Sequence, residues 1–130
     1  MVLVHDAARP FVTKEEVRAL LAALPGHDGA LLASPPVDTL WRVDQGVIQE
    51  VIERRGMVRA FTPQAFPYAT LLSALRDGLA QGFEGTDDAA FVRRGGGKVA
   101  WVQGGRWNIK VTYPEDLALV EAILGGSGCA

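Results

Sequence analysis

The stretch Val2-Leu3-Val4-His5-Asp6-Ala7-Ala8-Arg9-Pro10-Phe11 decides the predicted fold. Its three consecutive aliphatic residues are typical of a strand buried on both faces inside a parallel sheet. Pro10 removes a backbone donor and discourages further pairing, which leaves Asp6 and Arg9 at the carboxyl end of the strand. Ligands of open α/β sheets bind at this edge, and arginine suits phosphate oxygens. A site for a phosphorylated or hydroxylated ligand and a plain surface ion pair both fit this spacing.

Length and composition indicate one globular domain over residues 1–130, and the order of strands and helices described below makes it an α/β domain. A hydrophobic content of 48% is enough for a real core. The net charge of −2 argues against nucleic-acid binding. No apolar run approaches the ~20 residues that span a bilayer, and none resembles a signal peptide. We therefore expect a soluble, cytoplasmic protein without a nucleic-acid or membrane partner.

Two features concern the ends of the sequence. Cys129 is the only cysteine, so the sequence holds neither a disulfide framework nor a thiolate metal site, and its pattern assigns Cys129 no role. Met1 stands directly before the first strand, whereas a central strand needs neighbours on both sides. We therefore expect an N-terminally truncated domain, the later part of a longer α/β protein.

The remaining pattern alternates strands and helices. Thr13 and Glu16 match a capping box before an apolar helical repeat that Pro25-Gly26 ends. This order predicts a Rossmann-like, mostly parallel sheet. The further strands are expected at 30–33, 58–61, 98–102 and 108–112, and the further helices at 67–80, 86–92 and 114–124.

An inserted β-arm is predicted at about residues 38–56. Segments 38–43 and 47–52 alternate polar and apolar residues around the turn Asp44-Gln45-Gly46, which is a hairpin signature. A two-stranded ribbon is marginal by itself. Exposed Trp41 and Ile48 would be more stable against a partner, so we expect a dimer contact. Packing of the arm on its own domain is the alternative.

Further polar residues follow the predicted strands or begin the predicted helices. Thr62 ends strand 58–61, Thr86 is the expected N-cap of helix 86–92, and Lys110 lies just before the last helix. Arg54, at the base of the arm, could reach a phosphate, and the alternative is that it is simply solvated. Lys110 could likewise be an ordinary surface lysine. Together the set suits a small phosphorylated polyol: Asp6, Arg9, Arg54, Thr62, Thr86 and Lys110.

Other chemistries are less well supported. Asp87 and Asp88 suit the positive end of a helix dipole as well as a metal, so no metal site is assigned. The triplet 95–97 runs from a helix into a strand, opposite to a phosphate loop, and is expected to be a connector. His5 and His27 lack a Ser or Cys partner, which argues against a hydrolase.

Seven ordered motifs carry a specific resemblance. The sequence resembles the 2-C-methyl-D-erythritol 4-phosphate cytidylyltransferase family of the non-mevalonate isoprenoid pathway over essentially its whole length. The motifs are Val-His-Asp-Ala-Ala-Arg-Pro at 4–10, Asp38-Thr39, Arg54 with Gly56, Thr-Pro-Gln-Ala-Phe at 62–66, Thr-Asp-Asp-Ala at 86–89, Asn-Ile-Lys-Val-Thr at 108–112 and Pro-Glu-Asp-Leu at 114–117.

The resemblance implies a transferase reaction and a set of roles. Methylerythritol phosphate would attack the α-phosphate of CTP and release pyrophosphate, with Mg²⁺ brought by CTP. Asp6 and Arg9 would lie where the two substrates meet. Arg54 and Lys110 would complete the catalytic set by holding the acceptor, and Thr62 and Thr86 would add hydroxyl contacts. The arm would exchange between the subunits of a homodimer, so Arg54 would serve the neighbour's site.

The sequence also departs from the family. The family's Gly-rich loop with an arginine and a lysine, which wraps the triphosphate, has no match here, and neither has its cytosine-binding segment. Because losing a cationic clamp on phosphate raises the barrier strongly, we expect negligible activity from residues 1–130 alone. The alternatives are another sugar- or polyol-phosphate nucleotidyltransferase and a non-catalytic, dimerising phosphate-binding fragment.

Overall fold

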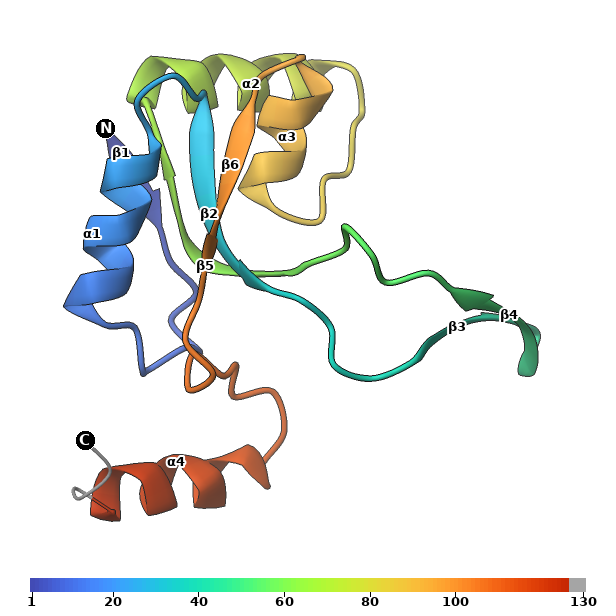
Figure 1. Cartoon of the computed structure of the whole chain (residues 1–130). Coiled ribbons are helices and arrows are strands. Elements are labelled where there is room, and N and C mark those ends of the chain that lie inside the picture. Colours follow the sequence, from blue (N-terminus) through green and yellow to red (C-terminus); the bar gives the residue numbers. More distant parts are fainter. Residues whose placement is uncertain (127–130) are drawn as a thin grey trace.

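A four-stranded sheet forms the centre of the molecule (Figure 1). The computed structural model describes residues 1–126. The strand order is β1 (Val2–Val4), β5 (Arg59–Phe66), β2 (Gly29–Ser34) and β6 (Val99–Gln103). β2 and β6 are parallel, while β5 is antiparallel to both of its neighbours. Three of the four strands therefore point the same way, and the predicted mostly parallel α/β fold is confirmed.

Helices cover both faces of the sheet. On one face, Leu20 of α1 (Lys14–Ala23) packs against Ala30 and Leu32 of β2, and all three are fully buried. On the other face, α2 (Tyr68–Ala80) and α3 (Asp88–Arg94) form a second cluster around Phe66. Burying each large aliphatic or aromatic side chain contributes about 1.5–3 kcal/mol. These two apolar layers hold the strand ends in fixed positions.

The first strand differs from its prediction. The run Val2-Leu3-Val4 predicts a strand buried on both faces, but β1 lies at one edge of the sheet and pairs only with β5 among residues 1–126. Val2 and Val4 pack into the second cluster, whereas Leu3 is 38% exposed. The alternation of side chains along a strand explains the difference, because this short strand has one covered face.

β5 is longer than predicted. Its pairing with β2 jumps from Gln64 opposite Leu31 to Ala60 opposite Ala33, so Phe61, Thr62 and Pro63 lie in an irregularity of the ladder. Proline lacks the amide that a regular ladder would use, and bulges accommodate it. The predicted break at Thr62-Pro63-Gln64 is therefore a bulge inside a continuing strand.

The hairpin of β3 (Leu40–Asp44) and β4 (Val47–Ile52) projects away from the sheet (Figure 1). Gln45 and Gly46 connect the strands with φ angles of +46° and +81°, as a two-residue type I′ turn requires. Trp41 pairs with Val51, and Val43 with Ile48. These four side chains share one face and are each 50–58% exposed. The alternative, in which the arm buries them against its own domain, is not what the chain adopts.

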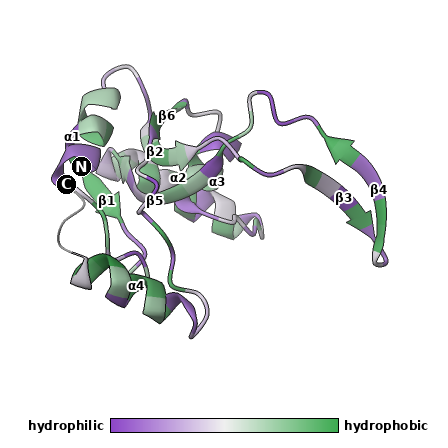
Figure 2. Cartoon of the chain, turned by 60° about the horizontal axis from the view of Figure 1, so that its bottom comes forward, coloured by the Kyte–Doolittle hydropathy of each residue, from purple (hydrophilic) through white to green (hydrophobic). Residues whose placement is uncertain are grey.

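The last helix, α4 (Asp116–Gly125), lies below the sheet (Figure 1) and is largely hydrophobic (Figure 2). With Phe11 and Trp107, its residues Leu119 and Ile123 border an apolar hollow of about 560 Å³. Over residues 1–126, none of the helices has both the length and the apolar character needed to cross a membrane.

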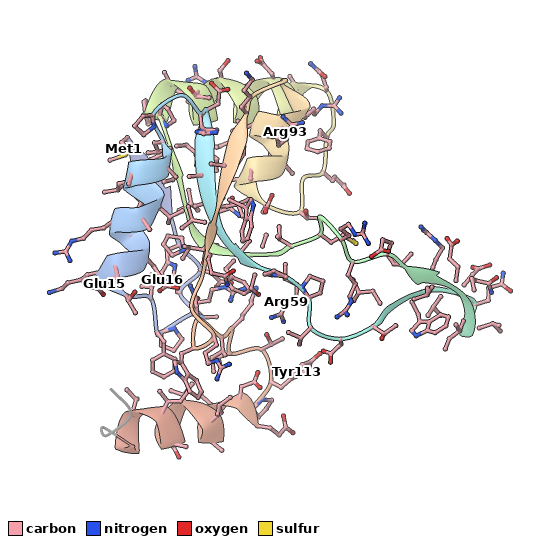
Figure 3. All side chains as sticks on the ribbon, in the orientation of Figure 1. Met1, Glu15, Glu16, Arg59, Arg93 and Tyr113 are labelled. Atoms are coloured by element: carbon pink, nitrogen blue, oxygen red, sulfur yellow. The ribbon has the colours of Figure 1, made fainter. Side chains whose placement is uncertain are left out.

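The predicted capping box at the start of α1 forms and reaches beyond the helix. Glu16 accepts the Thr13 amide at 2.8 Å, and its second oxygen accepts the Gly105 amide at 2.7 Å. Glu16 is only 8% exposed, whereas Glu15 points to solvent (Figure 3). One carboxylate therefore ties the first helix to the loop that follows β6.

We predict that Glu16→Ala lowers the free energy of unfolding by about 1–3 kcal/mol, because it removes the carboxylate that accepts the amides of Thr13 and Gly105. Glu15→Ala is the matched control, since its surface pair with Arg18 is worth less than about 1 kcal/mol. Urea unfolding monitored by circular dichroism measures both variants. Equal effects of the two substitutions would contradict the assignment.

Candidate functional site

A pocket of about 330 Å³ lies where the loop after β1, the bulge of β5, the start of α3 and the loop before α4 meet. It collects five of the six residues predicted from the sequence, and their roles in binding and catalysis remain a prediction. The pocket is lined by Asp6, Arg9, Ala60, Phe61, Thr62, Gln64, Thr86, Asp87 and Lys110.

The hollow between α4 and the segment before α1 is larger, but among the described residues no charged side chain lines it. The smaller pocket has cations, carboxylates and hydroxyls together. Because a phosphate needs charged or strongly polar donors, the pocket around Asp6 is the better candidate site for a phosphorylated ligand.

Asp6 and Lys110 join two loops across the pocket. The Lys110 Nζ lies 2.8 Å from one Asp6 oxygen, and the Ala8 amide donates to the other oxygen at 3.0 Å. The Val111 amide also donates to the Ala8 carbonyl at 2.8 Å. The hydrogen bond from Lys110, followed by that from the Ala8 amide, lowers the pKa of Asp6. The pocket thus keeps an ionised carboxylate and a lysine in contact.

Lys110 lies in a loop and not in the strand predicted over 108–112. The amides of this segment bond elsewhere: Asn108 to the Gly105 carbonyl at 3.1 Å, and Thr112 to the Asp116 carboxylate at 2.8 Å. The Tyr113 amide and then the Thr112 amide lower the pKa of Asp116. The apolar residues Ile109 and Val111 favour a strand, but in residues 1–126 no neighbouring strand pairs with them.

Arg9 is a half-buried cation that has no carboxylate partner in the described part of the chain. Its Nη1 donates to the Asn108 carbonyl at 2.8 Å, and its guanidinium lies 5.2 Å from the centre of the Phe61 ring. Within residues 1–126, no carboxylate oxygen lies within 4.0 Å of it, and its Nε is buried without a hydrogen bond. Burial lowers the pKa of Arg9, an effect that nearby Asp6 opposes. An anionic ligand would compensate this charge.

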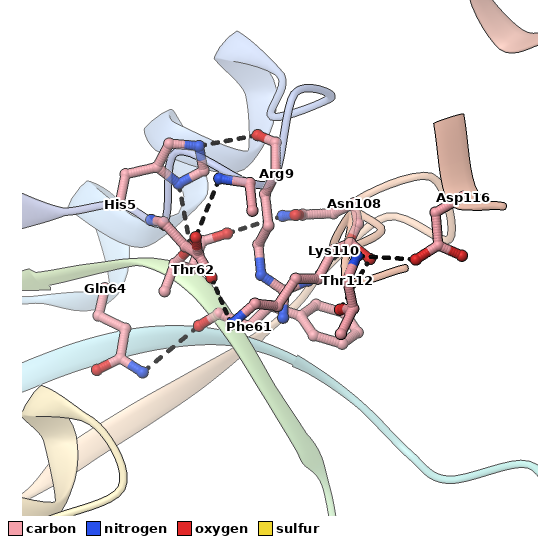
Figure 4. Close-up of polar contacts among 11 residues, drawn as sticks. His5, Arg9, Phe61, Thr62, Gln64, Asn108, Lys110, Thr112 and Asp116 are labelled. Carbon is pink, nitrogen blue, oxygen red and sulfur yellow. Dashed lines mark hydrogen bonds and ion pairs between the residues drawn. The ribbon is translucent and has the colours of Figure 1, made fainter. Parts of the chain in front are cut away.

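Thr62 faces the loop after β1 because of the bulge in β5. The Asp6 amide donates to its Oγ1 at 3.0 Å, and the Asn108 side-chain amide donates to its carbonyl at 2.9 Å (Figure 4). The sequence placed Thr62 at the carboxyl end of a strand, which is wrong, since it lies in the middle of β5. It reaches the same edge as Asp6 because β5 runs antiparallel to β1.

Thr86 lines the pocket, but it does not cap α3 as predicted. Asp87 is the N-cap, and its carboxylate accepts the Ala90 amide at 2.9 Å. Gln64, 1% exposed, donates to the other Asp87 oxygen at 2.9 Å and accepts the Ala89 amide at 3.0 Å. Because the carboxylate competes successfully for the cap, the helix begins one residue later and Thr86 stays at its entrance.

Arg54 is the predicted residue that the pocket does not include. Its Nη1 donates to the carbonyls of Pro36 at 3.1 Å and Asp38 at 3.2 Å, and also to that of Val37. These contacts close the base of the arm on itself. Within one chain, Arg54 is therefore a structural contact of the arm.

Sequence reasoning missed several residues that build this site. Asn108 and Gln64 lie within the family motifs, and the sequence pattern assigns them no role, yet both are nearly fully buried and bond across elements. Phe61, read only as a strand residue, supports Arg9. His5 was set aside for lack of a Ser or Cys partner, but it contacts Thr62 at 3.1 Å. The available signal for Gln64 was its position in the sequence, where a single amide side chain directly precedes the apolar residues Ala65 and Phe66.

The residues present do not form a protein cage for a metal ion. Across residues 1–126, no three His, Cys, Asp or Glu side chains gather in a way that could hold one. Asp6 and Asp87, the two carboxylates of the pocket, already bond to Lys110, to Gln64 and to backbone amides. Mg²⁺ often keeps few protein ligands and binds substrate phosphates instead. With these residues, a Mg²⁺ ion would have to be held mainly by the phosphates of a substrate.

Comparison with known proteins bears directly on this site. Residues 1–126 match the family described as 2-C-methyl-D-erythritol 4-phosphate cytidylyltransferase. The chain belongs to this family.

Two cytidylyltransferases of that name illustrate the match. The protein from Bacillus cereus is 46% identical over 123 residues, which cover 95% of this chain and 54% of that protein. The protein from Tolumonas auensis is 50% identical over 125 residues, which cover 95% of this chain and 55% of that protein. The chain thus spans about half the length of the curated relatives it matches.

A solved structure agrees with the fold. The cytidylyltransferase of Thermus thermophilus superposes with a TM-score of 0.87 at 36% identity, covering 95% of this chain and 61% of that one. The family's fold therefore extends through the sheet and the pocket described above.

We predict that Lys110→Met raises the pKa of Asp6, because it removes the main contact that lowers it. Since the folded-state pKa lies below the unfolded value, the Asp6 carboxylate contributes stability above the unfolded pKa and loses it as the pH falls through the folded pKa. Carboxyl carbon shifts in a pH titration by NMR measure the change. Asp116 is the control, because backbone amides lower its pKa. An unmoved Asp6 midpoint would contradict the pair.

Proposed function

We propose that the chain forms the acceptor-binding part of a cytidylyltransferase that transfers CMP from CTP to 2-C-methyl-D-erythritol 4-phosphate. The observation that carries the proposal is the half-buried guanidinium of Arg9, which has no carboxylate partner among residues 1–126 and lies beside Lys110 and Asp6 in one pocket. Two cations suit a phosphate monoester, while a carboxylate and two hydroxyls suit the polyol that bears it.

The proposed reaction is an in-line displacement. A phosphate oxygen of the acceptor attacks the α-phosphorus of CTP, a new P–O bond forms, and the bond to the β-phosphate breaks, so that pyrophosphate leaves with the electron pair. Such transfers depend on positioning and on stabilised charge more than on a protein nucleophile. Lys110 and Arg9 would hold the acceptor phosphate and offset the charge that gathers where the substrates meet.

The remaining contacts would orient the acceptor. Asp6 would accept from ligand hydroxyls with the lone pairs that Lys110 and the Ala8 amide leave, and Thr62 and Thr86 would add hydroxyl contacts from the opposite wall. Mg²⁺ would arrive on the triphosphate of CTP, where it would neutralise phosphate charge. Because the pocket recognises phosphate and hydroxyls more than a carbon skeleton, another polyol-phosphate nucleotidyltransferase is the second candidate.

The arm supports the proposal of a homodimer. Trp41, Val43, Ile48 and Val51 form one apolar face, which we call the arm face, and each is at least half exposed. Burying such a face against the same face of a second copy removes it from water, at about 25 cal/mol per Å². In this arrangement Arg54 of one chain would approach the pocket of its neighbour. A cytoplasmic location would follow from the pathway's soluble substrates.

We predict that residues 1–130 bind 2-C-methyl-D-erythritol 4-phosphate in isothermal titration calorimetry but show negligible turnover with CTP and Mg²⁺. Lys110→Met should weaken binding about tenfold or more, because a charge-assisted hydrogen bond contributes roughly 1.5–3 kcal/mol. Lys98→Met, an exposed lysine just before β6, should bind normally.

An unchanged dissociation constant in Lys110→Met would contradict the proposed site. Equal affinity for ribitol phosphate would favour the second candidate function. Near-normal turnover by the isolated chain would show that it needs no further nucleotide-binding part.

We predict a dimer in sedimentation velocity at tens of micromolar, and a monomer when Trp41→Lys places a charge in the centre of the arm face. Glu50→Gln is the control, because Glu50 pairs with Arg42 on the opposite face at 2.7 Å and should leave the dimer intact. A monomeric wild-type chain would overturn the role of the arm.

A further inference from the structure

His5 is hydrogen bonded at both ring nitrogens beside the candidate site. Its Nε2 lies 3.0 Å from the Arg9 carbonyl oxygen, and its Nδ1 lies 3.1 Å from the Thr62 hydroxyl (Figure 4). The ring therefore bridges the loop after β1 and the bulge of β5, the two segments that carry Asp6 and Thr62.

These partners determine where the protons lie. A carbonyl oxygen can only accept, so Nε2 of His5 must carry the proton. In a neutral imidazole the other nitrogen is then an acceptor, and the Thr62 hydroxyl must donate its proton to Nδ1. The Asp6 amide meanwhile donates to the same hydroxyl oxygen at 3.0 Å. One donor and one acceptor of Thr62 are thus already used.

A hydroxyl has one donor and two acceptor positions. With its proton committed to His5 and one lone pair to the Asp6 amide, Thr62 can offer only its second lone pair to the pocket that it lines. A lone pair accepts from a ligand hydroxyl but repels the oxygens of a phosphate dianion, which carry no proton. The same threonine with a free proton could also donate to a phosphate oxygen.

We infer that His5 is a positioning residue that makes Thr62 a contact for a hydroxyl group of the acceptor and not for its phosphate. The inference deepens the proposed function and rests on it. The phosphate then belongs at the opposite wall, where Lys110 and Arg9 lie, and the polyol chain runs across the pocket towards β5. The charged side chains that line the same pocket are Asp6, Arg9, Asp87 and Lys110, and Asp6 and Lys110 form an ion pair with each other.

The proton assignment can be measured without a ligand. Ring ¹⁵N–¹H correlation spectra at pH 8, where ordinary histidines are neutral, should show the Nε2-protonated form for His5. His27 is the internal control, because its Nδ1 lies 2.9 Å from the Ala23 carbonyl and should carry the proton instead. His27→Gln assigns the two sets of signals. An Nδ1-protonated His5 would overturn the inference.

The ligand preference tests the functional half of the inference. The measured quantity is the ratio of the dissociation constants of methyl phosphate, which has no hydroxyl, and 2-C-methyl-D-erythritol 4-phosphate. His5→Phe keeps the ring but frees the Thr62 proton, so the ratio should fall about three- to tenfold, the range of one hydrogen bond. His5→Asn supplies an amide oxygen near the former Nδ1 and should restore the ratio to within about twofold.

General damage to the fold would weaken both ligands together and leave the ratio unchanged, so a constant ratio in His5→Phe overturns the role of His5 alone. If the wild-type chain binds neither ligand, the proposed phosphate site fails as well, which separates the two failures. A His5→Phe chain that does not fold leaves the decision to the proton assignment of the wild-type chain.

Discussion

The candidate site depends on the attachment of one loop to another. The loop after β1 and the loop before α4 are separated by about a hundred residues in sequence, and they are held together by three contacts: the Asp6–Lys110 ion pair, the Val111 amide on the Ala8 carbonyl, and Arg9 on the Asn108 carbonyl. Each loop also bonds to Thr62 of β5, through the Asp6 amide and the Asn108 side chain, and the three contacts join the two loops directly to each other. The pocket is therefore a product of tertiary contacts between these segments.

The bulge in β5 is the second constraint. A regular strand through residues 61–63 would bury or expose Thr62 according to the pleat alone. The irregular ladder instead turns this short segment towards the loop after β1, where the Asp6 amide and His5 meet the hydroxyl. Phe61, in the same segment, supports the Arg9 guanidinium. The bulge thus contributes two side chains to the pocket: Thr62, which bonds to the loop after β1, and Phe61, which contacts Arg9.

The sequence predicts best those features that depend on neighbours in the chain. The capping box of Thr13 and Glu16 and the hairpin turn at Gln45-Gly46 are local, and both form as their chemistry requires. Asp6 and Arg9 could be placed because a strand followed closely by proline has a defined end. Thr62, Thr86 and Lys110 were predicted at the same edge from the ends of the expected strands and helices, and all three line the pocket, while their roles stay a prediction.

The features that the sequence does not predict depend on which distant residues compete for the same hydrogen bonds once the chain is packed. The apolar pattern of β5 does not determine its direction, so the sequence predicts Thr62 at the correct edge of the sheet but at the wrong point of its strand. Asp87 takes the cap of α3 because buried Gln64 orients its carboxylate. The pattern of residues 108–112 predicts a strand, yet their amides donate to carbonyl and carboxylate oxygens outside the sheet and not to a neighbouring strand. The bonds of His5 and Asn108 appear only once distant segments are packed.

The two walls of the pocket are held by different kinds of force. Across the β5–α3 wall, the fully buried Gln64 amide joins the strand to the cap of the helix by hydrogen bonds. Across the other wall stands the ion pair of Asp6 and Lys110, whose side chains are 28% and 51% exposed. Dissolved ions screen exposed pairs and hardly affect buried amides. Raising the ionic strength therefore loosens the lysine side of the pocket first, while the threonine side keeps its shape.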